Sequence, residues 1–169
     1  MARNFRQAPV RIIGIDPGSR ITGYGVIEKE GPRLGFISCG TIRTGSEKDF
    51  SRRLLVIFEG LYEVMELHGP EVAAVEDVFV AHNPRSALKL GQARGTAVVA
   101  AMKRGLAVHD YTPRMVKQAV AGYGQASKEQ VQHMVQALLE LSGAPSPDAA
   151  DALAVAVCHA NHMDRLLIT

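Results

Sequence analysis

An apolar run that ends on a carboxylate constrains the fold of this chain more than any other feature. Residues 12–15 are typical of a buried strand, and the next four, Asp-Pro-Gly-Ser, match a tight turn with proline second and glycine third. Apolar residues return over 21–27. We therefore predict a β-hairpin that presents Asp16 at an edge of a sheet. Turn chemistry is by itself sufficient to explain this aspartate.

The rest of the chain alternates between strand and helix patterns. After the hairpin we expect a strand at 34–43, a helix from about 51 to 69, a strand at 72–75, a helix at 83–104, a strand at 107–111, a short helix at 112–122, a helix at 127–143 and a last helix from 146. This order predicts an α/β fold: a mixed five-stranded sheet, part antiparallel hairpin and part parallel, with helices on both faces.

Length and composition place limits on the class of protein. The 169 residues suit one domain spanning 1–169, in which we expect 1–10 to be a mobile extension and about 162–169 a mobile tail. The two cysteines, Cys39 and Cys158, form no CxxC pair, which argues against a disulfide framework or a thiolate zinc site. No segment is typical of a signal peptide or a membrane span, so we expect a cytoplasmic protein without a membrane partner.

Charge is distributed unevenly. Residues 85–128 hold eight basic side chains and one acidic one, a local charge of +7 that leaves −5 for the rest of a chain whose total is +2. The basic residues are Arg85, Lys89, Arg94, Lys103, Arg104, Arg114, Lys117 and Lys128. This segment is compatible with a phosphate-binding surface and equally with an ordinary solvated one.

Three further acids stand at the ends of predicted elements. Glu76 closes the strand at 72–75, and Asp77 after it should point to the opposite face. Asp148 and Asp151 lie three apart at the start of the last helix and so share one side of it. Acids in a first helical turn also complement the helix dipole, which explains Asp148 better than the deeper Asp151. Each acid alone is more readily structural than catalytic.

Taken together, the four acids suggest a metal site. Both strand ends and the start of the last helix can meet at one edge of the proposed sheet, where converging carboxylates would repel one another without cations. Oxygen ligands without a cysteine or histidine cluster select Mg²⁺, with Mn²⁺ as a substitute. Two such ions about 4 Å apart are suited to in-line phosphoryl displacement. His159 and His162 have no third partner at a suitable spacing and are interpreted as structural or exposed.

Six motifs in order give the chain a family resemblance. GIDPGSRITGYGVI, AVEDVF, SALKLGQARG, VKQAV, VQHMVQALL and DAADALA together resemble the RuvC family of Holliday-junction resolvases, from about residue 11 to 159. The DPGS turn alone is weak because actin-like proteins have similar turns, but the ordered set is specific. The resemblance implies a ribonuclease H-like fold.

The resemblance also implies roles for individual residues. The family's four catalytic, metal-binding acids fall on Asp16, Glu76, Asp148 and Asp151. Its junction-probing aromatic falls on Phe79, for which a core position is the alternative. The family's basic positions at the scissile strand fall on Lys117 and Lys128, although ordinary surface lysines would look the same. From the basic segment we also assign Arg85 to DNA binding.

The function implied is structure-selective, Mg²⁺-dependent cutting of four-way DNA junctions by symmetric paired nicks, in recombination and repair. The implied partners are junction DNA, a second copy of the chain and a branch-migration motor of the RuvA and RuvB type. The helix at 83–104, with Gly91 and Gly95 on one stripe, is our candidate dimer interface, and a central core helix is the alternative. Two rival functions are an actin-like ATP phosphotransferase, disfavoured by the short chain and the lack of a Walker loop, and a junction-binding module without catalysis.

Overall fold

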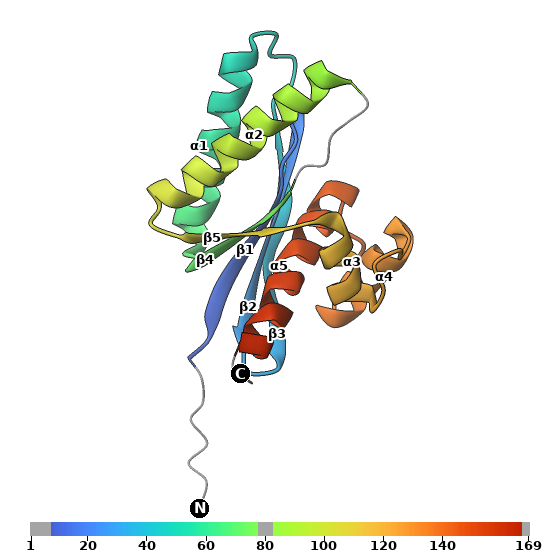
Figure 1. Ribbon diagram of the computed structural model, residues 1–169. Coiled ribbons are helices and arrows are strands. Elements are labelled where there is room, and N and C mark those ends of the chain that lie inside the picture. Colours follow the sequence, from blue (N-terminus) through green and yellow to red (C-terminus); the bar gives the residue numbers. More distant parts are fainter. Residues whose placement is uncertain (1–7, 78–82, 167–169) are drawn as a thin grey trace, which may run out of the picture.

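The structure is a computed structural model that describes residues 8–77 and 83–166. Its elements follow the predicted order (Figure 1). They are β1 (Val10–Asp16), β2 (Ile21–Glu30), β3 (Arg33–Arg43), α1 (Phe50–His68), β4 (Val72–Glu76), α2 (Pro84–Lys103), β5 (Ala107–Tyr111), α3 (Pro113–Ala121), α4 (Lys128–Leu138) and α5 (Pro147–Leu166).

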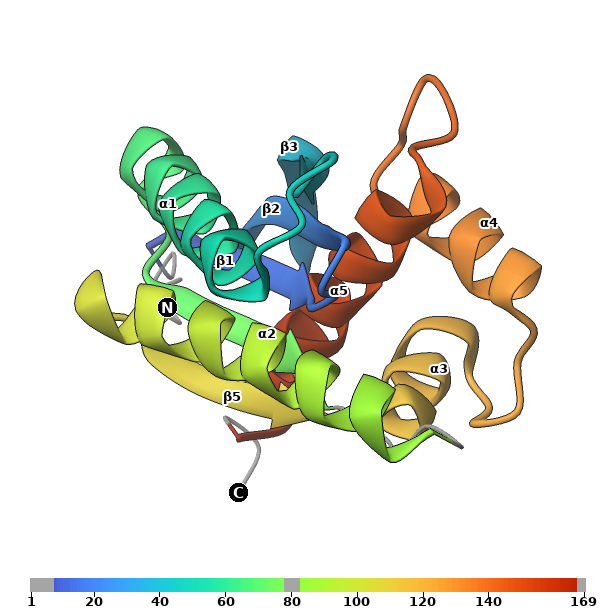
Figure 2. The same cartoon turned by 90° about the horizontal axis from the view of Figure 1, so that it is seen from above.

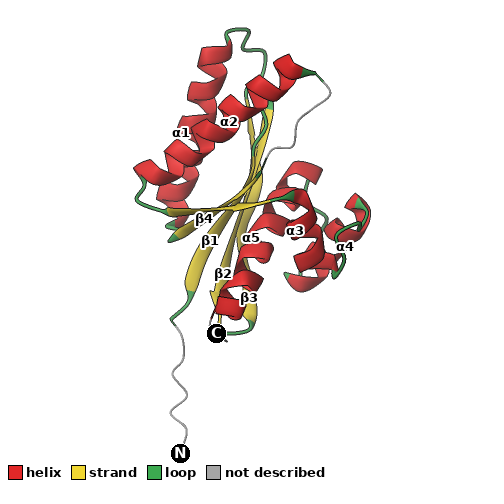
Figure 3. Cartoon of the chain, viewed as in Figure 1, coloured by secondary structure: helices red, strands yellow, loops and turns green. Residues whose placement is uncertain are grey.

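One five-stranded sheet forms the centre of the fold, with the strand order β3-β2-β1-β4-β5. The pairs β1–β2 and β2–β3 are antiparallel, whereas β1–β4 and β4–β5 are parallel. The predicted mixed sheet is therefore confirmed. Since β1, β4 and β5 run in the same direction, their carboxyl ends lie along one edge of the sheet (Figure 3). We call this the carboxyl edge.

Helices cover both faces of the sheet, as predicted. Figure 2 shows α1 and α2 on one side and α3, α4 and α5 on the other. The first layer closes over a core that includes Ile13, Ile57 and Leu61. The second core includes Ile12, Val135 and Leu153 and takes in the middle of α5. The sheet residues alternate between the two cores, as the period of two in a strand requires.

Helix α5 lies against the sheet with little side-chain material between them. A methyl group added at Gly14 would overlap the carbonyl oxygen of Ala152 and lie 2.6 Å from the amide nitrogen of Ala156. One added at Gly23 would overlap the carbonyl oxygen of Asp148. Glycine within a strand is often explained by such a close backbone approach. These glycines thus fix how near the acidic start of α5 can come to β1 and β2.

The helix ends follow local chemistry, with two departures from expectation. The predicted capping box of Ser127 and Gln130 is present at the start of α4. That helix ends at Leu138, earlier than the predicted 143, because Glu140 takes a left-handed φ of 50° that stops helical propagation. Helix α5 continues into the expected tail, where Asp164 pairs with the Lys29 ammonium at 2.8 Å.

No helix in the described ranges combines the length and the apolar content needed to cross a bilayer.

Candidate active site

The sheet register places the first two acids side by side. Ile15 pairs with Val75 across the parallel strands β1 and β4, so the residues that follow, Asp16 and Glu76, end neighbouring strands. Neighbouring strands are about 4.8 Å apart. Both side chains are half-buried at the carboxyl edge. The hairpin turn behind Asp16 is held by Thr22, whose hydroxyl donates to the carbonyl oxygen of Gly18 at 2.8 Å.

The other two acids reach the same place on α5. Gly23 is the register partner of Asp16 on β2, and the Asp148 backbone lies directly over Gly23. Asp151 follows one turn later and is also half-buried. Three elements that are remote in sequence therefore bring together the four acids that the sequence singled out.

The pKa values show how closely the acids interact. The pKa of Asp16 is raised to about 8, first by burial and then by the negative charges of Glu76 and Asp151, with a smaller contribution from Asp148. Burial also raises the pKa of Glu76, although a hydrogen bond from Asp16 opposes that shift. The protonated Asp16 carboxyl thus donates to the Glu76 carboxylate. Burial and the neighbouring carboxylates thus both disfavour the charged form of Asp16.

Two lysines lie beside the acids. The Lys128 ammonium lies 2.7 Å from an Asp151 carboxylate oxygen, and this hydrogen bond is the main cause of the raised pKa of Lys128. The charges of Lys128 and Lys117 both lower the pKa of Glu76. A cavity of about 170 Å³ opens between these groups. It is lined by Glu76, Pro113, Val116, Lys117, Lys128, Val131, Asp151 and Ala154.

The donor atoms of this cluster are of the type that hard divalent cations prefer. They are carboxylate oxygens with an excess of negative charge, and the proton on Asp16 and the ammonium of Lys128 provide the compensation that a divalent ion would supply. Among the described residues, no three side chains of the types that bind metals converge tightly enough to hold an ion as they stand. The kind of donor atom thus fits a divalent ion, whereas the present spacing of the described side chains does not form a closed metal site.

Two further residues, Arg85 and Phe79, were predicted to contact DNA. Arg85 is exposed in the first turn of α2, where its amide donates to the N-cap side chain of Asn83 at 2.9 Å. Phe79 lies outside the described residues. Asp77 is exposed and pairs with Arg94 at 3.5 Å, so it points away from the cluster that holds Glu76, as strand alternation predicted.

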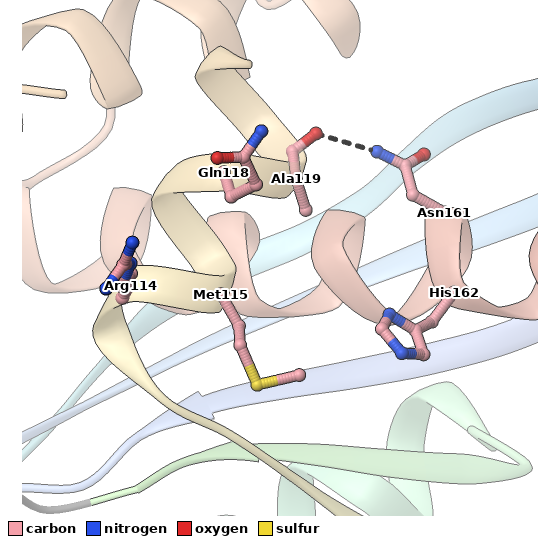
Figure 4. A pocket seen from close by; sticks show the side chains of 6 residues that line it. All are labelled: Arg114, Met115, Gln118, Ala119, Asn161 and His162. Carbon is pink, nitrogen blue, oxygen red and sulfur yellow. Dashed lines mark hydrogen bonds between the residues drawn. The ribbon is translucent and has the colours of Figure 1, made fainter. Parts of the chain in front are cut away.

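A larger hollow, of about 260 Å³, lies on the outer surface of α3 and α5 (Figure 4). Its lining residues are Arg114, Met115, Gln118, Ala119, Asn161 and His162. The Asn161 amide donates to the carbonyl oxygen of Ala119 at 3.0 Å, which ties the two helices together across it. No carboxylate lines this hollow, so it is separate from the acidic cluster.

Sequence reasoning missed two features of the site. The first is the set of strand glycines that admit α5, for which Gly14, Gly23 and Gly25 within strand patterns were the available signal. The second is the ion pair between Lys128 and Asp151. No periodicity or spacing could indicate that pair, because it joins the starts of two separate helices.

Comparison with known proteins identifies a family to which this chain is similar. The family model described as "Crossover junction endodeoxyribonuclease RuvC" matches residues 12–159. A protein of that name from Geobacter metallireducens is 60% identical over 152 residues, which cover 90% of this chain and 93% of the relative. One from Acinetobacter baylyi is 59% identical over 150 residues, covering 89% and 82%.

Solved structures agree. The Thermus thermophilus RuvC structure in complex with a Holliday junction substrate superposes with a TM-score of 0.87 at 37% identity, covering 92% of this chain and 96% of that one. The yeast mitochondrial Holliday junction resolvase Ydc2, at 13% identity, has a TM-score of 0.68 over 94% and 82% and shows the shared fold alone. The ribonuclease H-like fold is thereby confirmed. The motifs, the sheet and these matches agree that this chain belongs to the RuvC family of crossover junction endodeoxyribonucleases.

Proposed function

We propose that this protein is a single-domain endonuclease that resolves four-way DNA junctions by hydrolysing one phosphodiester bond in each of two strands. The observation that carries the proposal is the convergence of Asp16, Glu76, Asp148 and Asp151, which is close enough to raise the pKa of Asp16 to about 8. Family membership supports the junction as the substrate.

In the proposed mechanism the carboxylates of Asp16, Glu76, Asp148 and Asp151 would hold two divalent ions, Mg²⁺ or in its place Mn²⁺. Bound there, such ions would supply an activated water and charge stabilisation for the departing 3′ oxygen. Asp16 must lose its proton to serve as a ligand. Lys128 must exchange its partner Asp151 for DNA phosphate, and Lys117 lines the same cavity from α3. The lysines thus keep the acids neutralised until substrate and metal arrive.

The direct test uses a synthetic four-way junction with each strand labelled in turn, incubated with protein and Mg²⁺ beside a linear duplex. We expect paired nicks in two junction strands and little cutting of the duplex. Asp16→Asn and Asp151→Asn should each lower nicking by more than about 100-fold, since even groups one step removed from a metal contribute 10- to 100-fold. Equal cutting of duplex and junction would refute the selectivity.

A matched control is available next to the site. Asp77 adjoins Glu76 but pairs with Arg94 on the other face, so Asp77→Asn should nick within about twofold of the wild type. Metal binding has its own readout: Mg²⁺ should raise the unfolding temperature of the wild type more than that of Asp16→Asn. A wild type that binds junctions but leaves them intact in both Mg²⁺ and Mn²⁺ would instead support the non-catalytic junction-binding module.

A two-fold substrate suits a homodimer, and α2 offers a surface for one. Leu88, Val99 and Met102 on this helix are 70%, 58% and 59% exposed. A methyl group added at Gly91 or Gly95 would meet no described atom within 4 Å. We propose that this stripe packs against its copy in a partner subunit. Val99→Glu should then shift the mass in sedimentation toward the monomer.

We also propose that the protein acts in the cytoplasm and contacts a branch-migration motor of the RuvA and RuvB type.

A further inference from the structure

The loop that joins β3 to α1, residues 44–49, lies at the carboxyl edge beside the candidate active site. Strand β3 is parallel to β1 because each is antiparallel to β2. In the register, Asp16 pairs with Gly23, and Gly23 pairs with Thr41 on β3. Two strand spacings, about 10 Å, therefore separate Asp16 from Thr41, and β3 ends two residues later at Arg43. Figure 2 shows this loop near the turn that follows β1.

Buried Thr44 fastens the loop to that turn. Its amide donates to the carbonyl oxygen of Arg20 at 3.1 Å, and its hydroxyl lies 3.4 Å from the carbonyl oxygens of Ser19 and Arg20. The Arg53 guanidinium donates to the carbonyl oxygen of Glu47 at 2.6 Å and braces the other end of the loop. The loop is thus held against the segment that positions Asp16.

The basic side chains of this region point into solvent. Arg20, Arg43 and Lys48 are all exposed, and within the described chain none of them forms a side-chain hydrogen bond or ion pair. The acids of the loop are engaged locally. The Glu47 carboxylate accepts from the Asp49 amide at 2.9 Å, and Asp49 caps α1 by accepting from the Ser51 amide at 3.0 Å.

The surface between these groups is concave and rich in small residues. A shallow hollow of about 590 Å³ is lined by Arg43, Thr44, Gly45, Ser46, Glu47, Lys48 and Val56. A phosphate backbone can approach such a surface closely, and unpaired arginine and lysine side chains are the usual donors to its oxygens. Lys117 and Lys128 approach the acids from elsewhere, because they lie on α3 and α4, the helices that follow β5 in the chain and pack on α5.

We propose that Arg20, Arg43 and Lys48 form a second phosphate-binding surface, which holds the backbone of a junction arm on the β3 side of the carboxylates. This inference rests on the proposed function. The DNA strand then crosses the acids between two basic flanks. Phosphate contacts of this kind fix the register of DNA on a protein without reading its sequence. The surface would therefore position the scissile phosphate and leave sequence preference unchanged.

The test measures the salt dependence of junction binding in EDTA, by fluorescence anisotropy between 50 and 300 mM NaCl. Each phosphate contact contributes about 0.9 to the slope of log K against log salt, so for each bound subunit Arg43→Gln should reduce the slope by about 0.9 and the triple Arg20→Gln, Arg43→Gln, Lys48→Gln variant by about 2.7. Arg43→Lys should retain the wild-type slope, because it retains the charge.

The matched control lies on the same strand. Arg33 is exposed at the opposite end of β3, about 33 Å from Arg43 along an extended strand, so Arg33→Gln should leave the slope unchanged. An unchanged slope in the triple variant, or an equal reduction in Arg33→Gln, would overturn the proposal. Nicking is measured separately in Mg²⁺. If the wild type nicks junctions but the triple variant binds them with the wild-type salt slope, the phosphate-binding surface is refuted and the proposed function stands. If the wild type never nicks junctions, the proposed chemistry is refuted, whatever the salt slopes show.

Discussion

The two faces of the sheet are packed in different ways, and the difference has consequences for the site. On the α1 and α2 face, large side chains such as Ile57, Leu61 and Met65 fill the space between layers. On the other face, α5 contacts the strands almost backbone to backbone at Gly14 and Gly23. Side chains can adjust to a change, whereas backbone contacts cannot. The helix that carries two of the four acids is thus on the face that tolerates least movement.

The largest expected effect is the difference in stability between two variants, each of which adds one methyl group on a different face of the sheet. At Gly14→Ala the new methyl meets backbone atoms of α5, so the helix must shift, and we expect a loss of about 3 kcal/mol in the free energy of unfolding. At Gly60→Ala on α1 it meets only the Ile42 side chain, at 2.9 Å, which can rotate. That change should cost less than about 1 kcal/mol, since alanine also favours the helix.

Urea denaturation of both variants measures these costs, and nicking at a temperature where each is folded measures the site. Gly14→Ala should nick more slowly than the wild type because Asp148 and Asp151 move with α5. Equal costs in the two variants would contradict the proposed difference between the faces.

An intermediate effect on the free energy of unfolding is expected when the pH is lowered. His159 on α5 is buried, and the Tyr111 hydroxyl lies 2.7 Å from its Nδ1. Burial and then the nearby His109 and His162 lower its pKa from 6.5 to about 4. As the pH falls, the His159 imidazole is protonated in the unfolded chain before it is protonated in the folded one. The free energy of unfolding that this residue contributes is therefore fully present above pH 6.5 and is lost as the pH drops toward 4. Between pH 7 and 5 the loss from this group is about 2 kcal/mol.

Denaturation at pH 7 and pH 5 checks this sign. His159→Gln should lose about 2 kcal/mol less stability over that interval than the wild type does. His133→Gln, at an exposed position on α4, controls for the loss of a histidine. A His159→Gln profile parallel to that of the wild type would show that this ring does not resist protonation.

The smallest effect is expected on the side-chain-packed face. Ile57 is fully buried on α1, and Ile57→Val removes one methyl group at a cost of about 1 kcal/mol in the free energy of unfolding. Neighbouring side chains absorb the gap, so the nicking rate of the folded protein should match the wild type. A slower nicking rate would mean that this layer also positions the carboxylates.

Particular residues show how far sequence reasoning reached. The caps at Asn83, Thr112 and Ser127 predicted where three helices begin, because an N-cap acts on amides within its own turn. The end of α4 was placed too late, since the apolar pattern continues past the left-handed turn at Glu140. The ten elements and their order were otherwise predictable from local periodicity.

The proximity of Asp16 and Glu76 was predictable from the sequence, whereas the protonation and ion pairing of the candidate site were not. Acids at the ends of buried strands are visible in sequence, and the parallel order of β1 and β4 makes them neighbours. The proton shared by Asp16 and Glu76 and the Lys128–Asp151 pair depend on distances of a few ångströms between distant segments. The phosphate-binding surface proposed at the β3–α1 loop could not be predicted, because its charges are scattered singly along the chain.

The sequence by itself determined the elements, the mixed sheet and the placement of four acids at the ends of elements, because periodicity, caps and strand-end charges act over a few residues. Only the tertiary structure decided how close those acids come and which cations approach them. The physical reason is that α5 reaches the sheet through the missing side chains of Gly14 and Gly23, a contact between segments more than 120 residues apart. Electrostatic coupling falls off with distance, so that contact sets the chemistry available at the carboxyl edge.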